Sequence, residues 1–361
     1  MSTDLFEPVG QGPDEVANRL LAATLGAQEL LAIYAGDQLG WYASLVAHPG
    51  STSAELAGRT STDERYVREW LEHQAVAGYV TVDPDRRFSL TDGAREVLTD
   101  ADSEFFLAPL GRLQAATGRV VDDLLDAYRT GGGVSWAHLG DDARTAQAAL
   151  NRPFFLGPLV DDVLPAIPSL HTLLRGGGRL ADIGCGMGWS SIAIARAYPE
   201  ASVVGIDIDA PSIEAARLNA ASEGVDVTFE LADASSSGGA FDVVTFFECV
   251  HDMPDPVAVL AAARAMVRDD GYVMVADERT LEEFVAPAGP VERLFYGWSL
   301  GVCLPDGRAT SPSVATGTVM RPSTLERYAR AAGFVGIEVL PVELDLLRFY
   351  RLLISPEPDP R

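Results

Sequence analysis

The sequence contains no lysine, so all 27 of its basic residues are arginine, and they stand against 52 acidic residues. The formal net charge is -25 at pH 7. No segment gathers the arginines into a basic patch, and duplex DNA and anionic lipid are bound mainly through such clusters. The composition therefore argues against nucleic acid and against a membrane surface as partners.

Cysteine is also scarce. The three cysteines, Cys185, Cys249 and Cys303, are odd in number and lack the spacing of disulfide-bonded or metal-binding cysteines. They predict neither a disulfide nor a metal site, and they fit a reducing compartment. The sequence also lacks an uninterrupted run of about 18 apolar residues and a basic-then-apolar start, so we expect a cytoplasmic protein.

With 361 residues, 47 % of them hydrophobic, the chain is long enough for two domains with a large core. Apolar residues at helical spacing in segment 14–34 predict an amphipathic helix with a strong buried face. Two capping boxes, at Thr52 with Glu55 and at Ser61 with Glu64, then predict two further helix starts.

Two short strands, predicted at 79–82 and 87–90, follow these helices and complete the pattern of a winged helix. The helix that would enter the major groove of DNA, 61–77, carries four acids against two arginines, and phosphate would repel it. We therefore expect residues 1–98 to form a dimerisation domain and the protein to be a homodimer.

The next segment, 99–175, is expected to be a helical linker that contributes Phe154 and Phe155 to a substrate pocket; the alternative is that these rings pack in the core of the following domain. From residue 176 onward the pattern alternates between strands and helices, which indicates a parallel sheet. We therefore expect the catalytic domain to occupy 176–361.

A glycine-rich loop follows the first strand of this domain. The strand, 180–183, runs into Gly184, Gly186 and Gly188, and a helix begins at about Trp189. Glycines at the start of a helix let the backbone approach a ligand closely. A dinucleotide-binding loop needs its third glycine at position 189, where this chain has an indole that would obstruct a pyrophosphate.

Three acids accompany three successive strands: Asp182 lies in the first, Asp207 ends the second and Asp233 follows the third. A carboxylate repels a pyrophosphate but attracts the ammonium and sulfonium groups of S-adenosylmethionine. Asp207 suits the ribose hydroxyls and Asp233 the adenine amino group, because ionised carboxylates only accept hydrogen bonds. The pattern predicts S-adenosylmethionine as cofactor and S-adenosylhomocysteine as product. The predicted cofactor site comprises Asp182, Gly184, Cys185, Gly186, Gly188, Trp189, Asp207, Ile208, Asp233, Ala234 and Phe247.

The order of the segments LADIGCGMG, VVGIDID, LADAS and FDVVTFFECVHDMPDP makes the chain from about Leu180 to Thr280 resemble the class I S-adenosylmethionine-dependent methyltransferases. Taken with the winged-helix start, the whole chain is similar to a bacterial group of such enzymes. The resemblance implies an α/β, Rossmann-like sheet of seven strands, six parallel and one antiparallel, behind an N-terminal helical, winged-helix domain.

The segment ECVHDMPD is similar to the HDW segment of small-molecule O-methyltransferases, in which the histidine is the general base. Carried over by position, His251 would be the base and Asp252 its neighbour, although Met253 stands where an aromatic residue is usual. An unperturbed histidine titrates near 6.5, which suits proton removal near neutral pH. Glu248 is the second candidate, as proton acceptor or as hydrogen-bond partner of the substrate.

An insertion at about 281–320 is expected to be a substrate lid, with Tyr296 and Trp298 in an apolar pocket; the alternative is a core helix followed by a surface loop. Together these features predict O-methylation of a small-molecule metabolite. Two alternatives remain at this point. One is carbon or nitrogen methylation by positioning without a base, and the other is a cofactor-sensing regulator whose winged helix binds DNA.

Overall fold

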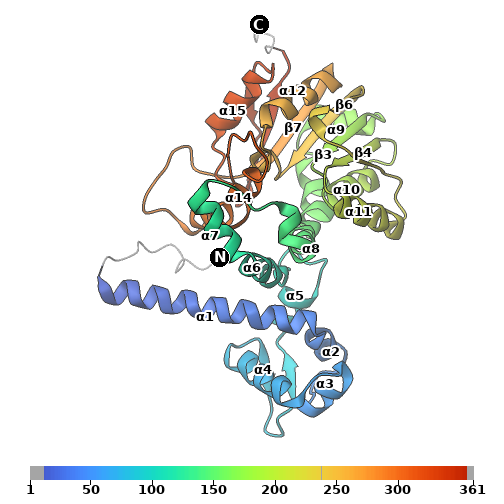
Figure 1. Cartoon of the computed structure of the whole chain (residues 1–361). Coiled ribbons are helices and arrows are strands. Elements are labelled where there is room, and N and C mark those ends of the chain that lie inside the picture. The colour runs from blue at the N-terminus through green and yellow to red at the C-terminus, as the bar shows by residue number, and fades with distance from the viewer. Residues whose placement is uncertain (1–11, 237, 356–361) are drawn as a thin grey trace. The chain divides into compact units, whose positions relative to one another are not determined.

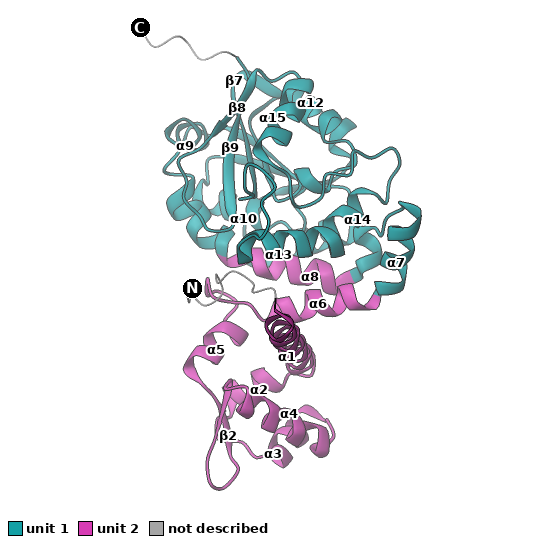
Figure 2. Cartoon of the chain, turned by 90° about the vertical axis from the view of Figure 1, so that its left-hand side faces the viewer, with its two compact units in different colours: residues 1–8, 120–140, 154–361 teal, residues 9–119, 141–153 magenta. Residues whose placement is uncertain are grey.

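The computed structural model describes residues 12–236 and 238–355. The chain falls into two compact units (Figure 2). Unit 1 contains Val120–Gly140 and the chain from Phe154 onward, and unit 2 contains Val9–Arg119 and Asp141–Pro153. The segment 99–175 is therefore divided between the two units. None of the helices in the described ranges has the length and apolarity needed to cross a bilayer.

Unit 1 is built on a seven-stranded sheet with the order β5-β4-β3-β6-β7-β9-β8 (Figure 1). Every strand is parallel to its neighbours except β9, which runs antiparallel to both β7 and β8. The predicted α/β sheet of six parallel strands and one antiparallel strand is thus confirmed. The strands are β3 (Arg179–Ile183), β4 (Ser202–Asp207), β5 (Thr228–Leu231), β6 (Phe241–Phe247), β7 (Val267–Glu278), β8 (Gly336–Val339) and β9 (Leu347–Leu353).

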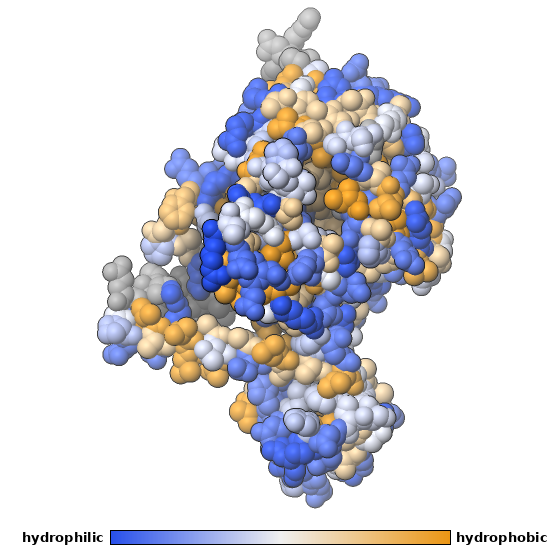
Figure 3. Space-filling model, viewed as in Figure 1, coloured by the Kyte–Doolittle hydropathy of each residue, from blue (hydrophilic) through white to orange (hydrophobic). Residues whose placement is uncertain are grey.

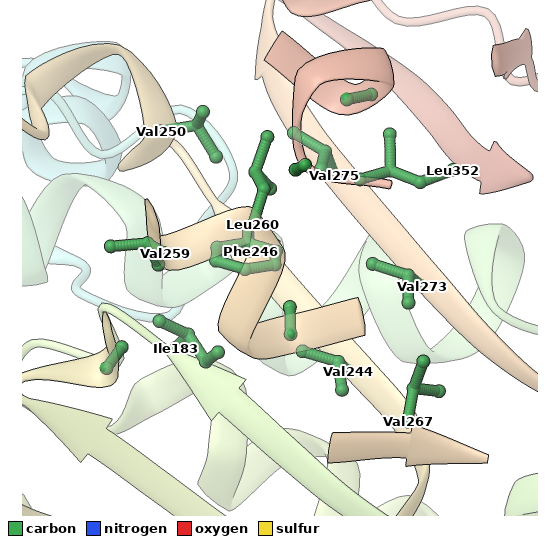
Figure 4. Close-up of a cluster of buried hydrophobic side chains, with 14 of the residues drawn as sticks. Ile183, Val244, Phe246, Val250, Val259, Leu260, Val267, Val273, Val275 and Leu352 are labelled. Atoms are coloured by element: carbon green, nitrogen blue, oxygen red, sulfur yellow. The ribbon is translucent and has the colours of Figure 1, made fainter. Parts of the chain in front are cut away.

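Helices cover both faces of this sheet, which explains why its central strands are apolar on both sides. On one face, Ile183, Val244 and Phe246 pack with Leu260 of α12 in a buried cluster (Figure 4). Helix α15 contributes to the same cluster. The helices on this face are α12 (Pro256–Met266) and α15 (Pro322–Ala331), and those on the other are α9 (Pro168–Arg175), α10 (Trp189–Ala197) and α11 (Ala210–Glu223).

The chain builds the sheet outward from β3 in one direction and then returns to place β6 on the other side of β3. Ligands of open α/β sheets bind at such a reversal, at the carboxyl ends of the strands. The topology therefore places the candidate site at the ends of β3, β4, β5, β6 and β7.

The winged helix of unit 2 has the predicted order of elements. Thr52 caps the second of its helices through a capping box with Glu55, as predicted. The next helix also forms, but the cap predicted for it is wrong, because its N-cap is Asp63 and Ser61 instead ends the preceding helix in a left-handed conformation. The elements are α2 (Trp41–Ala47), α3 (Ser53–Thr60), α4 (Glu64–Val76), β1 (Val80–Val82), β2 (Phe88–Leu90) and α5 (Asp92–Thr99).

The first helix, α1 (Pro13–Gln38), forms where it was predicted but lacks the strong buried face. It buries only Ile33 and Gly36, both near its end. Residues 13–28 are exposed, and large apolar side chains along α1 therefore face solvent (Figure 3). Sequence periodicity identified the helix but not what covers it.

The remaining helices lie in the segment between the winged helix and β3 and in the insertion after β7. They are α6 (Pro109–Arg119), α7 (Val121–Thr130), α8 (Trp136–Phe154), the π-helix η2 (Phe155–Val163), α13 (Pro290–Trp298), the π-helix η5 (Ser299–Cys303) and α14 (Leu304–Gly307). Most of the first half of the predicted lid insertion is thus helical.

Candidate active site

The loop after β3 is held by glycines in left-handed conformations. Gly184 and Gly188 have φ values of 71° and 83°. A Cβ on Gly184 would lie 2.8 Å from the sulfur of Cys249, and one on Gly188 would lie 2.7 Å from the ring of Phe229. Both positions therefore require glycine for backbone conformation and for packing.

Gly186 differs from the other two glycines of this loop. Its φ is 52°, and a Cβ there would meet nothing within 4 Å. Its N–H donates to Oδ2 of Asp207 at 2.8 Å. The backbone at Gly186 is thus anchored to the end of β4 and has open space beside it. A ligand could approach the backbone closely at this position.

Asp182 lies beneath this loop and is only 1 % exposed. It accepts hydrogen bonds from Ser190 and Ser191 at 2.6 Å each and from Thr245 at 2.9 Å. Burial raises the pKa of this carboxyl group above its usual range. In this arrangement Asp182 ties β3 to α10 and β6, and its side chain does not face the open space beside Gly186.

Asp207 ends β4 and is held by two backbone donors. Oδ2 accepts from Gly186, and Oδ1 accepts from the N–H of Asp209 at 2.8 Å. Each oxygen keeps a second lone pair, so the carboxylate can still accept hydrogen bonds from a diol. The next residue, Ile208, is 73 % exposed, which leaves an apolar surface beside the carboxylate.

Asp233 follows β5 and is exposed, with Oδ1 accepting from the N–H of Ser235 at 2.8 Å. Its neighbour Ala234 is buried. Because β3, β4 and β5 are adjacent in the sheet, Asp207 and Asp233 leave the same edge as the glycine loop. The structure thus brings together most of the predicted cofactor residues.

The side chains of two further predicted cofactor residues pack against the protein interior. Cys185 is 7 % exposed and packs near Gly205, where an added Cβ would lie 2.9 Å from its sulfur. Trp189 is half-buried at the start of α10 and packs against a buried cluster that includes Ile192 and Ile213. Their side chains support the loop from within.

The end of β6 supplies Phe247, Glu248 and His251. Phe247 is buried and packs edge-to-face on Phe155, with ring centroids 5.4 Å apart. Glu248 has a φ of 50°, an uncommon conformation for a residue with a Cβ, and its N–H donates to the carbonyl of Ala276 at 2.8 Å. Backbone strain of this kind clusters at functional sites.

His251 lies in a short 3-10 turn, η4 (Val250–Asp252), and is only 1 % exposed. Its Nδ1 lies 2.8 Å from Oδ1 of Asp277 and 3.1 Å from Oε2 of Glu278. Its Nε2 lies 3.3 Å from Oδ1 of Asp252. Both ring nitrogens therefore face carboxyl groups.

Burial alone would lower the pKa of the His251 imidazole, but Asp252, Asp277 and Glu278 together raise it well above its usual range. Burial would raise the pKa of Asp277, yet the neighbouring imidazole holds it below its usual range. Burial raises the pKa of Glu278 well above its usual range. The neighbouring carboxyl groups therefore favour the charged form of the imidazole, as the partners of a general base should.

Sequence reasoning found His251 and Asp252 but missed Asp277 and Glu278. Both lie at the end of β7, where two acids follow a buried strand, the same signal that identified Asp207. It also treated Cys303 as a cysteine without a role, whereas the thiol lies against Asp252 and His251. Burial raises the pKa of this thiol to about 12.

Part of the insertion covers His251. The N–H of Gly317 donates to the carbonyl of His251 at 3.1 Å, and that of Val314 donates to the carbonyl of Pro254 at 2.9 Å. On the other side, the N–H of Trp136 donates to Asp306 at 2.6 Å. Hydrogen bonds at Asp306, Val314 and Gly317 therefore fix this part of the predicted lid beside the buried imidazole.

The four aromatic residues predicted for the substrate pocket fall into two groups. Phe154 and Phe155 lie near each other, with centroids 5.6 Å apart. Tyr296 packs on Phe284, and Trp298 packs on Phe295. Within the described ranges, no ring contact joins the first pair to the second.

A shallow cavity of about 390 Å³ lies elsewhere, where β7 begins. Its lining includes Pro168, Tyr272 and Arg351, and none of the residues described above. It is therefore at the opposite edge of the sheet from His251.

The chain matches two family models. Residues 174–294 match a model described as a methyltransferase domain, and residues 27–100 match an Rv2258c-like winged HTH domain. The ubiquinone biosynthesis O-methyltransferase of Thiobacillus denitrificans is 30 % identical over 182 residues, which cover 49 % of this chain and 73 % of that protein. The enzyme of the same name from Aromatoleum aromaticum is 33 % identical over 169 residues, covering 45 % and 67 %.

Solved structures share the fold over nearly the whole chain. An O-methyltransferase family protein from Burkholderia thailandensis has a TM-score of 0.71 at 19 % identity, with 95 % of this chain and 99 % of that chain covered. Human N-acetylserotonin methyltransferase, solved in complex with S-adenosylmethionine, has a TM-score of 0.71 at 16 % identity and the same coverage. At these identities the likeness concerns the fold.

Proposed function

Since the chain belongs to the class I S-adenosylmethionine-dependent methyltransferases, we propose that it methylates an oxygen atom of a small-molecule substrate, with His251 as the general base. The observation that carries the proposal is the buried contact of 2.8 Å between His251 and Asp277 at the edge that also holds the glycine loop. When bound, the cofactor supplies an electrophilic methyl group on a sulfonium. The protein's task is then to align and deprotonate the accepting oxygen.

The cofactor would lie along the ends of β3, β4 and β5. The open side of Gly186 offers room for backbone approach, and Asp207 would accept the ribose hydroxyls beside the exposed side chain of Ile208. Asp233 would accept from the adenine amino group. Asp182 would contribute by holding the loop, since its oxygens are already bonded to three hydroxyl groups.

His251 would take the proton of the substrate hydroxyl on Nε2. Asp277 would hold Nδ1 and stabilise the imidazolium that forms, an arrangement that fixes both the ring orientation and the protonated nitrogen. Asp252 stands 3.3 Å from Nε2, at the place where the hydroxyl must arrive. Substrate entry would therefore displace Asp252 from the imidazole.

Glu248 remains the second candidate for contact with the substrate. It is half-buried, and its left-handed backbone turns the chain from β6 toward His251. His251 is the better proton acceptor, because its carboxylate partner would stabilise its charged form. We therefore propose that Glu248 accepts a hydrogen bond from the substrate and does not take its proton.

The deciding experiment compares methyl transfer by the wild type, His251→Ala and the control His138→Ala, whose imidazole is exposed on another helix. His251→Ala is expected to lower kcat by roughly 10²- to 10⁴-fold, the usual contribution of a general base, with affinity for S-adenosylhomocysteine kept. His138→Ala should resemble the wild type. A kcat that is unchanged by His251→Ala and flat from about pH 6 to 9 would favour carbon or nitrogen methylation by positioning alone.

We also propose that the protein is a homodimer joined through unit 2. Residues 13–28 of α1 are exposed, although helices in proteins gain most of their stability from packing of an apolar face. The large apolar residues of this stretch, Val16, Leu20, Leu21 and Leu25, lie on more than one side of the helix. A helix that is apolar on several sides is normally enclosed by protein, so a second copy would surround α1.

The regulator alternative finds no support in α4. The arginines of this helix are paired with acids, Arg65 with Glu69 and Arg68 with Glu64. These pairs leave little positive charge for phosphate.

We also propose that the protein lies in the cytoplasm, because all three cysteines are free.

A further inference from the structure

Carboxyl groups outnumber basic groups around His251. Asp252, Asp277 and Glu278 contact its two ring nitrogens, and Asp306 of α14 is close enough to Asp252 for the two charges to interact. In the described part of the chain, His251 is the one basic side chain in an ion pair with any of the first three acids. We call these four acids the acidic pocket.

Three oxygens of the acidic pocket lack a hydrogen-bond donor. Oδ1 of Asp252, Oδ2 of Asp277 and Oε2 of Glu278 are buried and accept no hydrogen bond within the described chain, although the first and third lie within ion-pair distance of His251. Asp277 and Glu278 are 1 % and 5 % exposed, so bulk water does not reach them either. Buried acceptors without donors are unfavourable, and a ligand that brings donors or positive charge removes this cost.

We infer that the acidic pocket accepts a substrate that carries a protonated amine close to the hydroxyl group to be methylated, and that it rejects carboxylate or phosphate analogues. The inference rests on the proposed function of the same site and adds the charge of the substrate. Repulsion of an anion by several buried carboxyl groups is stronger than it would be in water, because the surrounding dielectric constant is lower.

The cofactor does not remove the need for this positive charge. Its sulfonium would balance one carboxylate and His251 balances another. Two of Asp252, Glu278 and Asp306 then remain for the substrate. Burial raises the pKa of each of these carboxyl groups, and a protonated amine beside them would favour their charged forms. Asp306 already accepts from the N–H of Trp136, which fixes its carboxyl group in place.

The test measures binding by calorimetry to the full-length protein saturated with S-adenosylhomocysteine. Three probes share one catechol ring and differ in charge: dopamine, neutral 4-ethylcatechol and anionic 3,4-dihydroxyphenylacetate. Dopamine is expected to bind at least about tenfold more tightly than 4-ethylcatechol, and the acid more weakly than both. Equal affinities, tighter binding of the acid or no binding of dopamine would overturn the inference.

Two variants from different elements test the residues. Asp252→Asn and Asp306→Asn should each reduce the preference for dopamine over 4-ethylcatechol by about tenfold. Asp269→Asn, in which the exposed acid lies on the surface, should keep the preference. Thermal melting identifies which variants are folded, and an unchanged preference in the folded variants contradicts the inference.

Two further measurements separate this inference from its rivals. His251, Asp277 and Glu278 are close enough together to hold a metal ion, so titration with MgCl2 and ZnCl2 is included. Tight metal binding that abolishes the preference for dopamine would assign the acids to a metal ion and overturn the inference. If the acids serve only the sulfonium, Asp252→Asn will weaken binding of S-adenosylmethionine and leave the dopamine preference intact, which also overturns it.

Failure of the proposed function gives a different result. A protein that binds dopamine selectively but methylates none of the hydroxyl probes contradicts oxygen methylation and leaves the charge preference standing. A protein that binds 4-ethylcatechol and dopamine with equal affinity and methylates both contradicts the charge preference and leaves oxygen methylation standing.

Discussion

Nδ1 of His251 and Oδ1 of Asp277 lie 2.8 Å apart although the two residues come from the ends of different strands. The register of β6 and β7 explains the contact. Phe247, the last residue of β6, stands opposite Ala276, so Asp277 and Glu278 lie just beyond the level at which β6 ends. The N–H of Glu248 donates to the carbonyl of Ala276 and fixes the turn that leads to His251. The contact between His251 and Asp277 is therefore set by the pairing of β6 with β7, and both side chains are buried there.

Asp277→Asn is expected to move the acid limb of the pH profile of kcat to lower pH. The imidazolium of His251 loses a negative neighbour, so the pKa of this base falls from its raised position and the neutral form persists at lower pH. In the wild type the same limb should lie above the ordinary histidine value of about 6.5. Because Asn no longer stabilises the imidazolium, kcat on the plateau should also fall by at least about tenfold.

The measurement is a pH series of kcat, with the imidazole of His251 followed by NMR in the same variant. Asp269→Asn, which changes an exposed carboxylate far from the imidazole in sequence, is the matched control. A limb that stays in place, or moves to higher pH in Asp277→Asn, contradicts the assignment of His251 as the base.

The sheet and the winged helix could be predicted because their signals are local. Apolar strand patterns, the glycine loop and the Thr52 capping box each specify the conformation of a few neighbouring residues. The failure at Ser61 has the same origin. Asp63 is an equally suitable cap two positions later, and only the course of α3 decides between them.

The partners of His251 could not be predicted with equal certainty. Asp277, Glu278 and Cys303 approach the imidazole from two other segments, and their contacts depend on strand register and on the path of the insertion. Exposure of α1 was likewise hidden, because helical periodicity shows where the apolar residues lie but not what covers them.

Asp207→Ala is expected to weaken binding of S-adenosylhomocysteine by roughly 10- to 100-fold, through lost hydrogen bonds from the ribose to a charged acceptor. Asp207→Asn keeps one acceptor oxygen, so its affinity for S-adenosylhomocysteine should lie between those of the wild type and Asp207→Ala. Asp226→Ala, which removes an exposed acid on a neighbouring loop, serves as control. Calorimetric affinity that is unchanged in Asp207→Ala would show that the ribose contact is misplaced.

Gly317→Ala tests the cover over His251. Gly317 has a φ of 71°, and an added Cβ would lie 2.5 Å from Oγ of Ser299. We expect the free energy of unfolding to fall by about 1–3 kcal/mol, as overpacking usually costs, and kcat/KM to fall as the cover shifts. Chemical denaturation and steady-state kinetics measure both.

Two companion variants sharpen this test. Gly297→Ala adds a methyl group within α13 where nothing lies within 4 Å, so its stability and activity should match or exceed those of the wild type. The double change Gly317→Ala with Ser299→Ala removes the clashing oxygen and should recover part of the loss. Full activity of Gly317→Ala alone would mean that the cover does not control access.

The exposed apolar side chains of α1 predict that unit 2 carries the dimer contact. Leu20 and Leu25 are 69 % and 58 % exposed in the single chain, and burying them against a second copy would contribute hydrophobic free energy. Leu20→Glu with Leu25→Glu should therefore weaken the dimer by more than about tenfold, because a charge would be buried without a partner. Leu218→Glu changes an equally exposed leucine on α11 and should leave the dimer intact. Light scattering after gel filtration across a concentration series reads the mass directly, and a wild type that stays monomeric at every concentration contradicts the prediction.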